Sequence, residues 1–397
     1  MSTTSRPGVR AVVLRPPHLA WLALLLALPS HSQGAPASAA SEAYGLSVEG
    51  VSGEILDTAI EHCRRGERAQ AFSMFAAIRE QLDPPPALLR LVQDLEATGC
   101  VLQVASSAKG LKLQIGAGYD TNVTQGISAR TLTLGSGGQA LELELDDSYR
   151  PRASPFAQAA LEYTLPVPAL GGALQLGAAQ RSNFSASSLN VSTGSLSYIR
   201  SFEVLGKAAR VQADWSELWL GGRHYQRTTG ASLQWVPSSG PAGAWVASMS
   251  ALQVDYLTQS AQNAVQYEAG LNREQRINAS TAVYGGVSLT GDRAQGGRPG
   301  GDRSGYQAQA GMIFAVEGWR LRPQVSYQRW ASREVFAAGL IDTPRRNHTT
   351  QLAFVAERPL GANQTLVLEW RARDSRDNIA LYQYRSQTLL ATFQYRF

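Results

Sequence analysis

The sequence predicts an all-β transmembrane barrel of about 14 antiparallel strands, preceded by a small α-helical segment. Three observations support this prediction. From about residue 110 onward, apolar and polar residues alternate in runs of about ten, which is the pattern of a strand with one apolar face. The connections between these runs alternate between short and long. No run of 18 apolar residues follows the first 37 residues, so helical spans are not expected there.

Residues 1–37 are predicted to form a secretory signal peptide. An apolar stretch, Leu19–Leu28, precedes a zone of small residues, and cleavage is expected between Gly34 and Ala40. No cysteine directly follows the apolar stretch, so a lipid anchor is not expected. The formal net charge of +5 falls to +2 (5 − 3) once the signal's basic residues are removed, and no nucleic-acid partner is expected. These basic residues are Arg6, Arg10 and Arg15.

Residues 44–107 have a helical rather than a strand period. Gly66 interrupts the first helical run, and Pro84–Pro86 end the second. The arrangement is similar to tetratricopeptide (TPR) repeats, but only about one and a half repeats fit, whereas solenoids stack three or more. A helical plug or cap and a docking module both remain open for this TPR-like segment. The small or helix-breaking residues that carry the similarity are Ala59, Gly66, Ala69, Ala71 and Pro84.

The chain has two cysteines, Cys63 and Cys100, and both precede the barrel. Export to an oxidising periplasm favours a disulfide between them. The alternative is one buried and one exposed thiol.

Residues 110–397 are predicted to form the barrel, beginning with Leu111–Asp120. In this first strand, Leu111, Ile115 and Tyr119 are expected to face lipid, while the residues between them face the interior. Single-chain bacterial barrels have even strand counts, which fits fourteen. A bulge is expected where Ala251 and Leu252 adjoin, because the alternation slips there. The other predicted strands are 157–164, 173–180, 194–200, 209–216, 231–235, 245–256, 265–272, 282–290, 306–314, 319–328, 351–357, 366–373 and 389–397.

Long connections are expected at Thr121–Ser154, Gly291–Ser304 and Ala331–Asn347, as in the outer loops of such barrels. The glycine-rich Gly291–Arg303 stretch lacks the strand-to-helix context of a phosphate-binding loop, so a mobile outer loop is expected. Short turns are expected at Val204–Gly206, Glu317–Gly318 and Leu360–Asn363.

Aromatic residues near strand ends predict two interfacial girdles and favour a membrane barrel over a soluble sandwich. These residues are Tyr119, Tyr163, Tyr198, Trp215, Trp235, Tyr256, Trp319, Tyr327, Trp370 and Tyr395.

Charged residues on the polar strand faces are expected to line the lumen. They could set ion selectivity or form an internal salt-bridge network, and the sequence leaves both open. These lumen charges are Arg210, Asp214, Glu268, Arg320, Arg322, Glu369 and Arg371.

Enzymatic chemistry is not expected. The sequence has no phosphate-loop motif, no H-E-x-x-H motif and no paired-cysteine metal spacing. Beyond the signal, His62, His224 and His348 are the only histidines. We expect His348, at a loop-to-strand junction, to be solvated rather than catalytic. No catalytic residue, cofactor or metal site is therefore predicted.

The C-terminal strand carries Phe393, Tyr395 and the terminal Phe397 on one face. This ending resembles the signal by which the barrel-assembly machinery recognises bacterial outer-membrane barrels. The resemblance implies an outer-membrane protein in contact with outer-membrane lipids, with the helical segment in the periplasm.

The first predicted strand ends in a motif built from Gly116, Gly118, Tyr119, Asp120, Asn122 and Val123. The sequence Gly-Tyr-Asp-Thr-Asn-Val resembles the opening strand of the surface lipoprotein assembly modifier (Slam) family, whose barrels also follow TPR-like helices. The resemblance implies an outer-membrane barrel that assists the translocation of lipoproteins or other secreted proteins to the cell surface. The helical segment is much shorter than the multi-repeat domain of that family.

A second class of function also fits the sequence: a passive porin or an exopolysaccharide export channel. Lumen-facing aromatic platforms would favour sugar export, but most aromatics are predicted to face lipid. The sequence does not identify the client or solute, nor whether the pore is open or plugged.

Overall fold

The computed structural model describes residues 59, 68–81, 110–127, 131–134, 141–240, 243–278 and 280–397. The predicted signal peptide, Cys63, Cys100 and residues 82–107 of the expected helical segment lie outside these residues. Helix α4 (Arg68–Gln81) occupies the second expected helix and buries Ala71 and Phe75, which are one turn apart on one face. Within the described ranges, no helix is both long and apolar enough to span a membrane.

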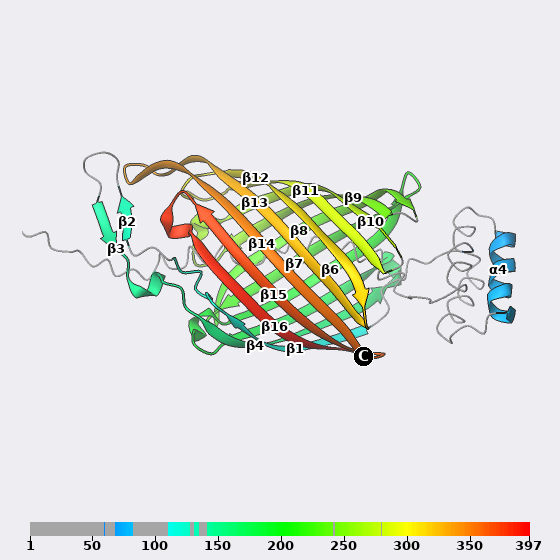
Figure 1. Cartoon of the computed structure of the whole chain (residues 1–397). Coiled ribbons are helices and arrows are strands. Elements are labelled where there is room, and N and C mark those ends of the chain that lie inside the picture. The colour runs from blue at the N-terminus through cyan, green and yellow to red at the C-terminus, as the bar shows by residue number, and fades with distance from the viewer. Residues whose placement is uncertain are drawn as a thin grey trace, which may run out of the picture.

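Fourteen strands close into one antiparallel barrel in which each strand pairs with its neighbours in sequence, and β1 pairs with β16. Thirteen of the predicted strands lie within one of them, and the last, 389–397, extends one residue beyond β16, so the predicted barrel is confirmed. Figure 1 shows the strands wrapping obliquely around a common axis. The barrel strands are β1 (Gly110–Asp120), β4 (Ser154–Val167), β5 (Gly172–Asn183), β6 (Val191–Val204), β7 (Lys207–Leu220), β8 (Arg223–Gly240), β9 (Gly243–Tyr256), β10 (Ala264–Arg276), β11 (Thr281–Ala294), β12 (Arg303–Val316), β13 (Trp319–Ala337), β14 (Ile341–Gly361), β15 (Gln364–Asp377) and β16 (Tyr384–Arg396).

The outer wall of the barrel is apolar, as the alternation predicts. In β1, the exposed residues are Ile115, Ala117 and Tyr119, while the residues between them are less exposed. Leu289 in β11 is 71% exposed and Leu389 in β16 is 61% exposed. A closed barrel has no unpaired strand edge, and apolar side chains on its outside suit hydrocarbon. The fold is therefore that of an outer-membrane barrel.

The two ends of the barrel differ. One end, called the turn end here, carries the chain terminus Phe397 and connections at 168–171, 205–206, 277–280, 317–318 and 362–363. The other end, called the loop end, carries 121–153, 184–190, 221–222, 257–263, 295–302, 338–340 and 378–383. The hairpin of β2 (Thr131–Leu134) and β3 (Leu141–Glu144) lies at this end, away from the C-terminus in Figure 1.

One of the expected connections differs from the structure. Ala331–Asn347 was expected to be a long loop, but β13 and β14 continue through most of it as an extended hairpin that turns at 338–340. The Thr121–Ser154 connection contains the β2–β3 hairpin and a short 3-10 helix, η2 (Asp147–Tyr149). Connections at the loop end are not uniformly long either, since Gly221 and Gly222 alone join β7 to β8.

The expected bulge at Ala251–Leu252 is wrong. β9 pairs with β10 in unbroken register, and the shift between β8 and β9 falls instead at Trp235–Ser238 of β8. The sequence pattern slips because Leu252 and Tyr256 are apolar residues on the interior face, where the neighbouring strands carry polar ones. Tyr256 is therefore not part of an outer girdle, since it is only 9% exposed and packs inside the barrel.

The barrel closes at the turn end through the C-terminus. Tyr395 pairs with Leu113 of β1, and the backbone N–H of Phe397 donates to the Leu111 carbonyl at 2.9 Å. The Phe397 ring contacts that of Tyr395 edge-on, with 4.5 Å between centroids, and is 66% exposed. The last aromatic residue therefore adds little buried area to the folded barrel.

Replacing Phe397 with serine is expected to lower the outer-membrane yield severalfold while leaving the thermal stability of the assembled fraction nearly unchanged. The ring is largely exposed in the folded barrel, so we expect it to act mainly during recognition by the assembly machinery. Membrane fractionation and heat-dependent gel mobility measure the two quantities. Leu340→Ser, at another exposed apolar position in the β13–β14 hairpin, serves as the control. An unchanged membrane yield for Phe397→Ser would count against an assembly role.

Candidate functional site

Most of the buried polar side chains of the barrel gather at its loop end. Asn122, Ser154, Asp292, Ser375 and Asp377 are at most 5% exposed, and all lie at or next to the loop end of a strand. Buried polar groups are costly unless they are hydrogen-bonded or paired. This end of the interior is therefore the candidate functional site, and its contacts show how it is held together.

Asp292 is the centre of an ion cluster. It lies on the β11 face opposite the exposed Val287 and Leu289, so it points into the barrel, and its side chain is fully buried. Its carboxylate accepts hydrogen bonds from the guanidinium groups of Arg298 and Arg303 and from the Arg303 backbone N–H at 3.0 Å. Arg298 also donates to the Gly301 carbonyl at 2.7 Å, which ties the 295–302 connection into the interior.

A second ion pair lies on β14 and β15. Arg345 Nε donates to Asp377 Oδ2 at 2.8 Å, and both side chains are at most 10% exposed. The Arg345 guanidinium lies 3.4 Å from the ring centre of Tyr382, in the β15–β16 connection. Burial raises the pKa of the Tyr382 phenol to about 12, so it remains neutral at physiological pH. We call Asp292, Arg298, Arg303, Arg345 and Asp377 the mouth cluster.

A group of buried apolar side chains lies on the inner face of the wall at the same end. Tyr225 and Tyr256 pack edge-to-face with 5.9 Å between ring centres. Outward-facing residues on β7 and β9, Trp215 and Met249, are 41% and 63% exposed, which places the alternate residues inside. The buried members of this group are Leu218, Leu220, Tyr225, Val254 and Tyr256, and Val191 and Leu252 pack against them.

The connections at the loop end also bind one another. The Gln295 N–H donates to the Asn263 carbonyl at 2.8 Å, which joins the β11–β12 connection to the β9–β10 connection. A side chain at Gly296 would come within 2.6 Å of the Ser260 carbonyl, so this close contact requires glycine. The sequence predicted a mobile loop at 291–303, but these contacts and the buried Arg298 make the segment a packed part of the mouth.

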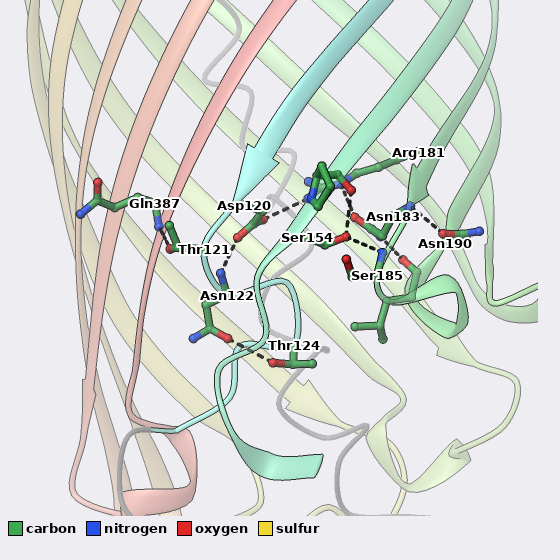
Figure 2. A network of polar contacts seen from close by, with 12 residues as sticks. Asp120, Thr121, Asn122, Thr124, Ser154, Arg181, Asn183, Ser185, Asn190 and Gln387 are labelled. Atoms are coloured by element: carbon green, nitrogen blue, oxygen red, sulfur yellow. Dashed lines mark hydrogen bonds and ion pairs between the residues drawn. The ribbon is translucent and has the colours of Figure 1, made fainter. Parts of the chain in front are cut away.

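The motif at the end of β1 forms a hydrogen-bond network, shown in Figure 2, whose centre is Asn122. Asn122 is 2% exposed, and its amide donates to the carbonyls of Gly126 and Arg385, both at 2.9 Å. Its side-chain oxygen accepts from the Gly126 N–H at 2.8 Å and from the Thr124 hydroxyl at 3.1 Å. Because Arg385 belongs to β16, Asn122 links the first strand's connection to the last strand across the closing seam.

Asp120 extends this network past β4, the other neighbour of β1, to β5. Its carboxylate accepts from the Asn122 N–H at 2.9 Å and pairs with Arg181 of β5 at 3.0 Å. The Arg181 guanidinium also lies 3.7 Å from the ring centre of Phe156, which is almost fully buried. Figure 2 shows Asp120 and Arg181 pointing toward each other beside Asn183.

The remaining motif residues have local roles in the seam. At Gly118, an added Cβ would lie 2.4 Å from the Leu389 carbonyl of β16, and at Gly116 it would lie 2.8 Å from that of Ala391. Tyr119 faces outward and is 48% exposed. The Val123 N–H donates to the Arg152 carbonyl at 2.8 Å.

Five of the seven lumen charges predicted from sequence are members of polar contacts between side chains. Arg371 pairs with Glu369, and Arg322 pairs with Glu357 at 3.3 Å. Gln212 bridges Arg210 and Asp214, with its amide 2.7 Å from the Asp214 carboxylate. Within the described part of the chain, Glu268 and Arg320 have no ion pair within 4.0 Å.

The histidines of the described residues take part in surface contacts. His348 Nδ1 lies 2.7 Å from the Tyr327 hydroxyl, and His224 contacts Glu217 and stacks on Trp219. No group of three or more metal-binding side chains occurs among the residues that the structure describes.

The sequence did not reveal Arg298, Arg303, Arg345 or Asp377 as members of a site. Arg298 and Arg303 belong to a glycine-rich stretch that was expected to be mobile, and Arg345 lies in a stretch expected to be a loop. The alternation could have placed Asp292 and Asp377 inside the barrel, because each continues the inward face of its strand.

No protein-family profile matches the chain, and no curated protein matches it. Solved structures that are similar in fold include the anion-selective porin from Comamonas acidovorans. Its sequence identity to this chain is 9% and the TM-score is 0.38. The match covers 73% of this chain and 99% of the porin. OccAB3 from Acinetobacter baumannii is 7% identical in sequence, with a TM-score of 0.37. The match covers 73% of this chain and 100% of the OccAB3 chain.

The COG4313 outer membrane channel from Pseudomonas putida F1 is 10% identical with a TM-score of 0.36, over 72% of this chain and 96% of its own. The conclusion about the fold rests on the strand pairing of this chain, which forms a closed 14-stranded antiparallel barrel of the outer-membrane type.

Proposed function

We propose that this protein is an outer-membrane conduit that assists the passage of lipoproteins or other secreted proteins to the cell surface. The proposal combines the polar interior of the barrel with the Slam-like motif at the end of β1. The packed loop end of the interior is the observation that carries it. There, the mouth cluster, the buried apolar group and the seam network around Asn122 line the inner wall with packed side chains, and we propose that they narrow the mouth.

A mouth held by ion pairs suits a conduit that opens only for its client. Asp292 and Asp377 are fully buried and each is held by arginine, so the side chains on the β11–β12 and β14–β15 sides of the mouth are fixed in place. Such an arrangement keeps small solutes from leaking between transport events. The periplasmic helical segment would guide the client toward the turn end, and client folding outside would supply the energy, because the sequence has no nucleotide-binding motif.

A passive porin or an exopolysaccharide export channel is the alternative. The ion pairs of the lumen, such as Arg322–Glu357, would suit a small-solute pathway as well. The two functions differ in what crosses the barrel and in whether the mouth is open at rest.

Co-expression with a candidate client tests the proposal. The probe is an epitope-tagged surface lipoprotein, produced in a Gram-negative host that lacks both the lipoprotein and the barrel. We expect the client to become accessible to antibody and protease on intact cells only when the barrel is present. Phe397→Ser, which lowers assembly, should reduce client exposure in proportion to barrel yield. Equal client exposure with and without the barrel would contradict the proposed function, and rapid sugar uptake by barrel-containing vesicles would favour the passive channel.

A further inference from the structure

Four arginines project from the outer wall of the barrel near its loop end. Arg329 lies on the same face of β13 as Val325, which is 42% exposed, and Arg346 lies on the face of Leu352 in β14. Arg376 on β15 and Arg385 on β16 have side chains that are 73% and 76% exposed. We call Arg329, Arg346, Arg376 and Arg385 the wall patch.

The strand register brings these residues together. His348 is the direct partner of Arg329 on one side and of Arg376 on the other, so the three side chains form a single row across three strands. Arg385 is the direct partner of Asp374, two residues from Arg376. Directly opposed residues in antiparallel strands have Cβ atoms about 4.5–5.5 Å apart. The patch is therefore continuous over β13, β14, β15 and β16.

The positive charge of the wall patch exceeds the negative charge beside it. Asp374 contacts two of the arginines, at 3.1 Å from Arg376 and 3.3 Å from Arg385. Arg329 and Arg346 have no ion pair within 4.0 Å in the part of the chain that the structure describes. On the β7–β8 side of the same rim, by contrast, Arg227 is matched by the buried Glu217 at 2.6 Å.

Neighbouring aromatic residues indicate the position of the wall patch relative to the membrane. Tyr327 lies two residues from Arg329 toward the turn end, and its ring is 6.1 Å from that of Tyr306. Tyrosines favour the boundary between hydrocarbon and headgroups, so side chains just beyond them reach the headgroup layer. In outer-membrane barrels the end opposite the chain termini faces outward, so this is the outer leaflet.

We infer that the wall patch binds the phosphorylated saccharide headgroup of the glycolipid that forms the outer leaflet. Guanidinium groups bind phosphate oxygens through paired hydrogen bonds. Arg329 and Arg346, which have no ion pair in the described part of the chain, attract a multivalent anion together with Arg376 and Arg385. Diffuse attraction to any anionic surface would not need four arginines held in register on a rigid wall. The inference rests on the barrel fold and its orientation, and not on the proposed translocation.

The test compares the full mature chain with Arg329→Gln/Arg346→Gln, which leaves both contacts of Asp374 intact. The probe is bisphosphorylated lipid A, titrated into detergent-solubilised barrel and followed by native mass spectrometry. We expect the double variant to bind lipid A at least about tenfold more weakly. Arg358→Gln, an exposed outward arginine at the turn end of β14, should bind within about twofold of wild type. Heat-dependent gel mobility establishes that each variant is folded.

Three outcomes would overturn the inference. The first is unchanged lipid A affinity in the folded double variant. The second is equal affinity for lipid A and phosphatidylglycerol, which would indicate attraction to any anionic lipid. The third is displacement of lipid A by a few millimolar inorganic phosphate, which would indicate a site for a soluble anion.

Discussion

Asp292→Ala is expected to lower the free energy of unfolding by about 3–5 kcal/mol, the usual cost of removing one partner from a buried ion pair. The substitution leaves Arg298, with a side chain only 5% exposed, and Arg303, at 19%, without their shared carboxylate. Urea unfolding of the purified barrel, followed by tryptophan fluorescence, measures the change. We also expect faster hydrogen exchange in residues 295–302, because Arg298 ties that connection to Asp292.

Asp147→Ala is the matched control for this prediction. Asp147 pairs with Arg150 at 2.9 Å, but its side chain is 88% exposed, and exposed ion pairs contribute little to stability. The control should unfold at the same urea concentration as wild type. Equal unfolding midpoints for Asp292→Ala and Asp147→Ala would show that the mouth cluster does not hold the loop end together.

Asn122→Ala is expected to destabilise the barrel by about 2–4 kcal/mol, since it leaves buried backbone groups without partners. The carbonyls of Gly126 and Arg385 lose their donor, and the Gly126 N–H keeps only the longer contact to the Thr124 hydroxyl at 3.3 Å. The damage should be local, because Asn122 joins the two strands that close the barrel. Hydrogen exchange should therefore rise most in residues 121–127 and 384–388.

Asn278→Ala gives the comparison at the other end of the barrel. Asn278 is exposed in the β10–β11 turn, where its side chain accepts hydrogen bonds from Ser280. Its loss should change stability by less than about 1 kcal/mol, because water replaces an exposed partner. Equal destabilisation by Asn122→Ala and Asn278→Ala would contradict this prediction. It would show that the hydrogen bonds of Asn122 do not stabilise the pairing of β1 with β16.

The barrel could be predicted from the sequence because lipid imposes a strict period of two on every strand. Leu368 and Trp370 of β15 are exposed to the outside, and Glu369 between them pairs with Arg371 inside. Because each lipid-facing position must be apolar, each of the fourteen strands shows the alternating pattern in its own sequence. The same constraint is absent where inward residues pack against one another, and Tyr256 was therefore assigned to the wrong face.

The mouth could not be predicted because its contacts join residues from different strands and connections. Arg345 and Asp377 are 32 residues apart and meet only because β14 and β15 pair in register. Asn122 and Arg385 are 263 residues apart and meet only when the barrel closes. The sequence placed Asn122 in the motif at the end of the first strand but did not predict its contact with Arg385. The local sequence pattern therefore predicted the strands of the wall, whereas the contacts at the loop end depend on tertiary pairing.

Single-channel conductance of the full mature barrel in planar lipid bilayers tests the central claim most directly. That claim is that packed ion pairs and apolar side chains keep the loop end of the interior closed at rest. The account predicts no large, stable open state for the wild type and frequent openings for Asp292→Ala. A wild-type barrel that conducts steadily through a wide pore would contradict it.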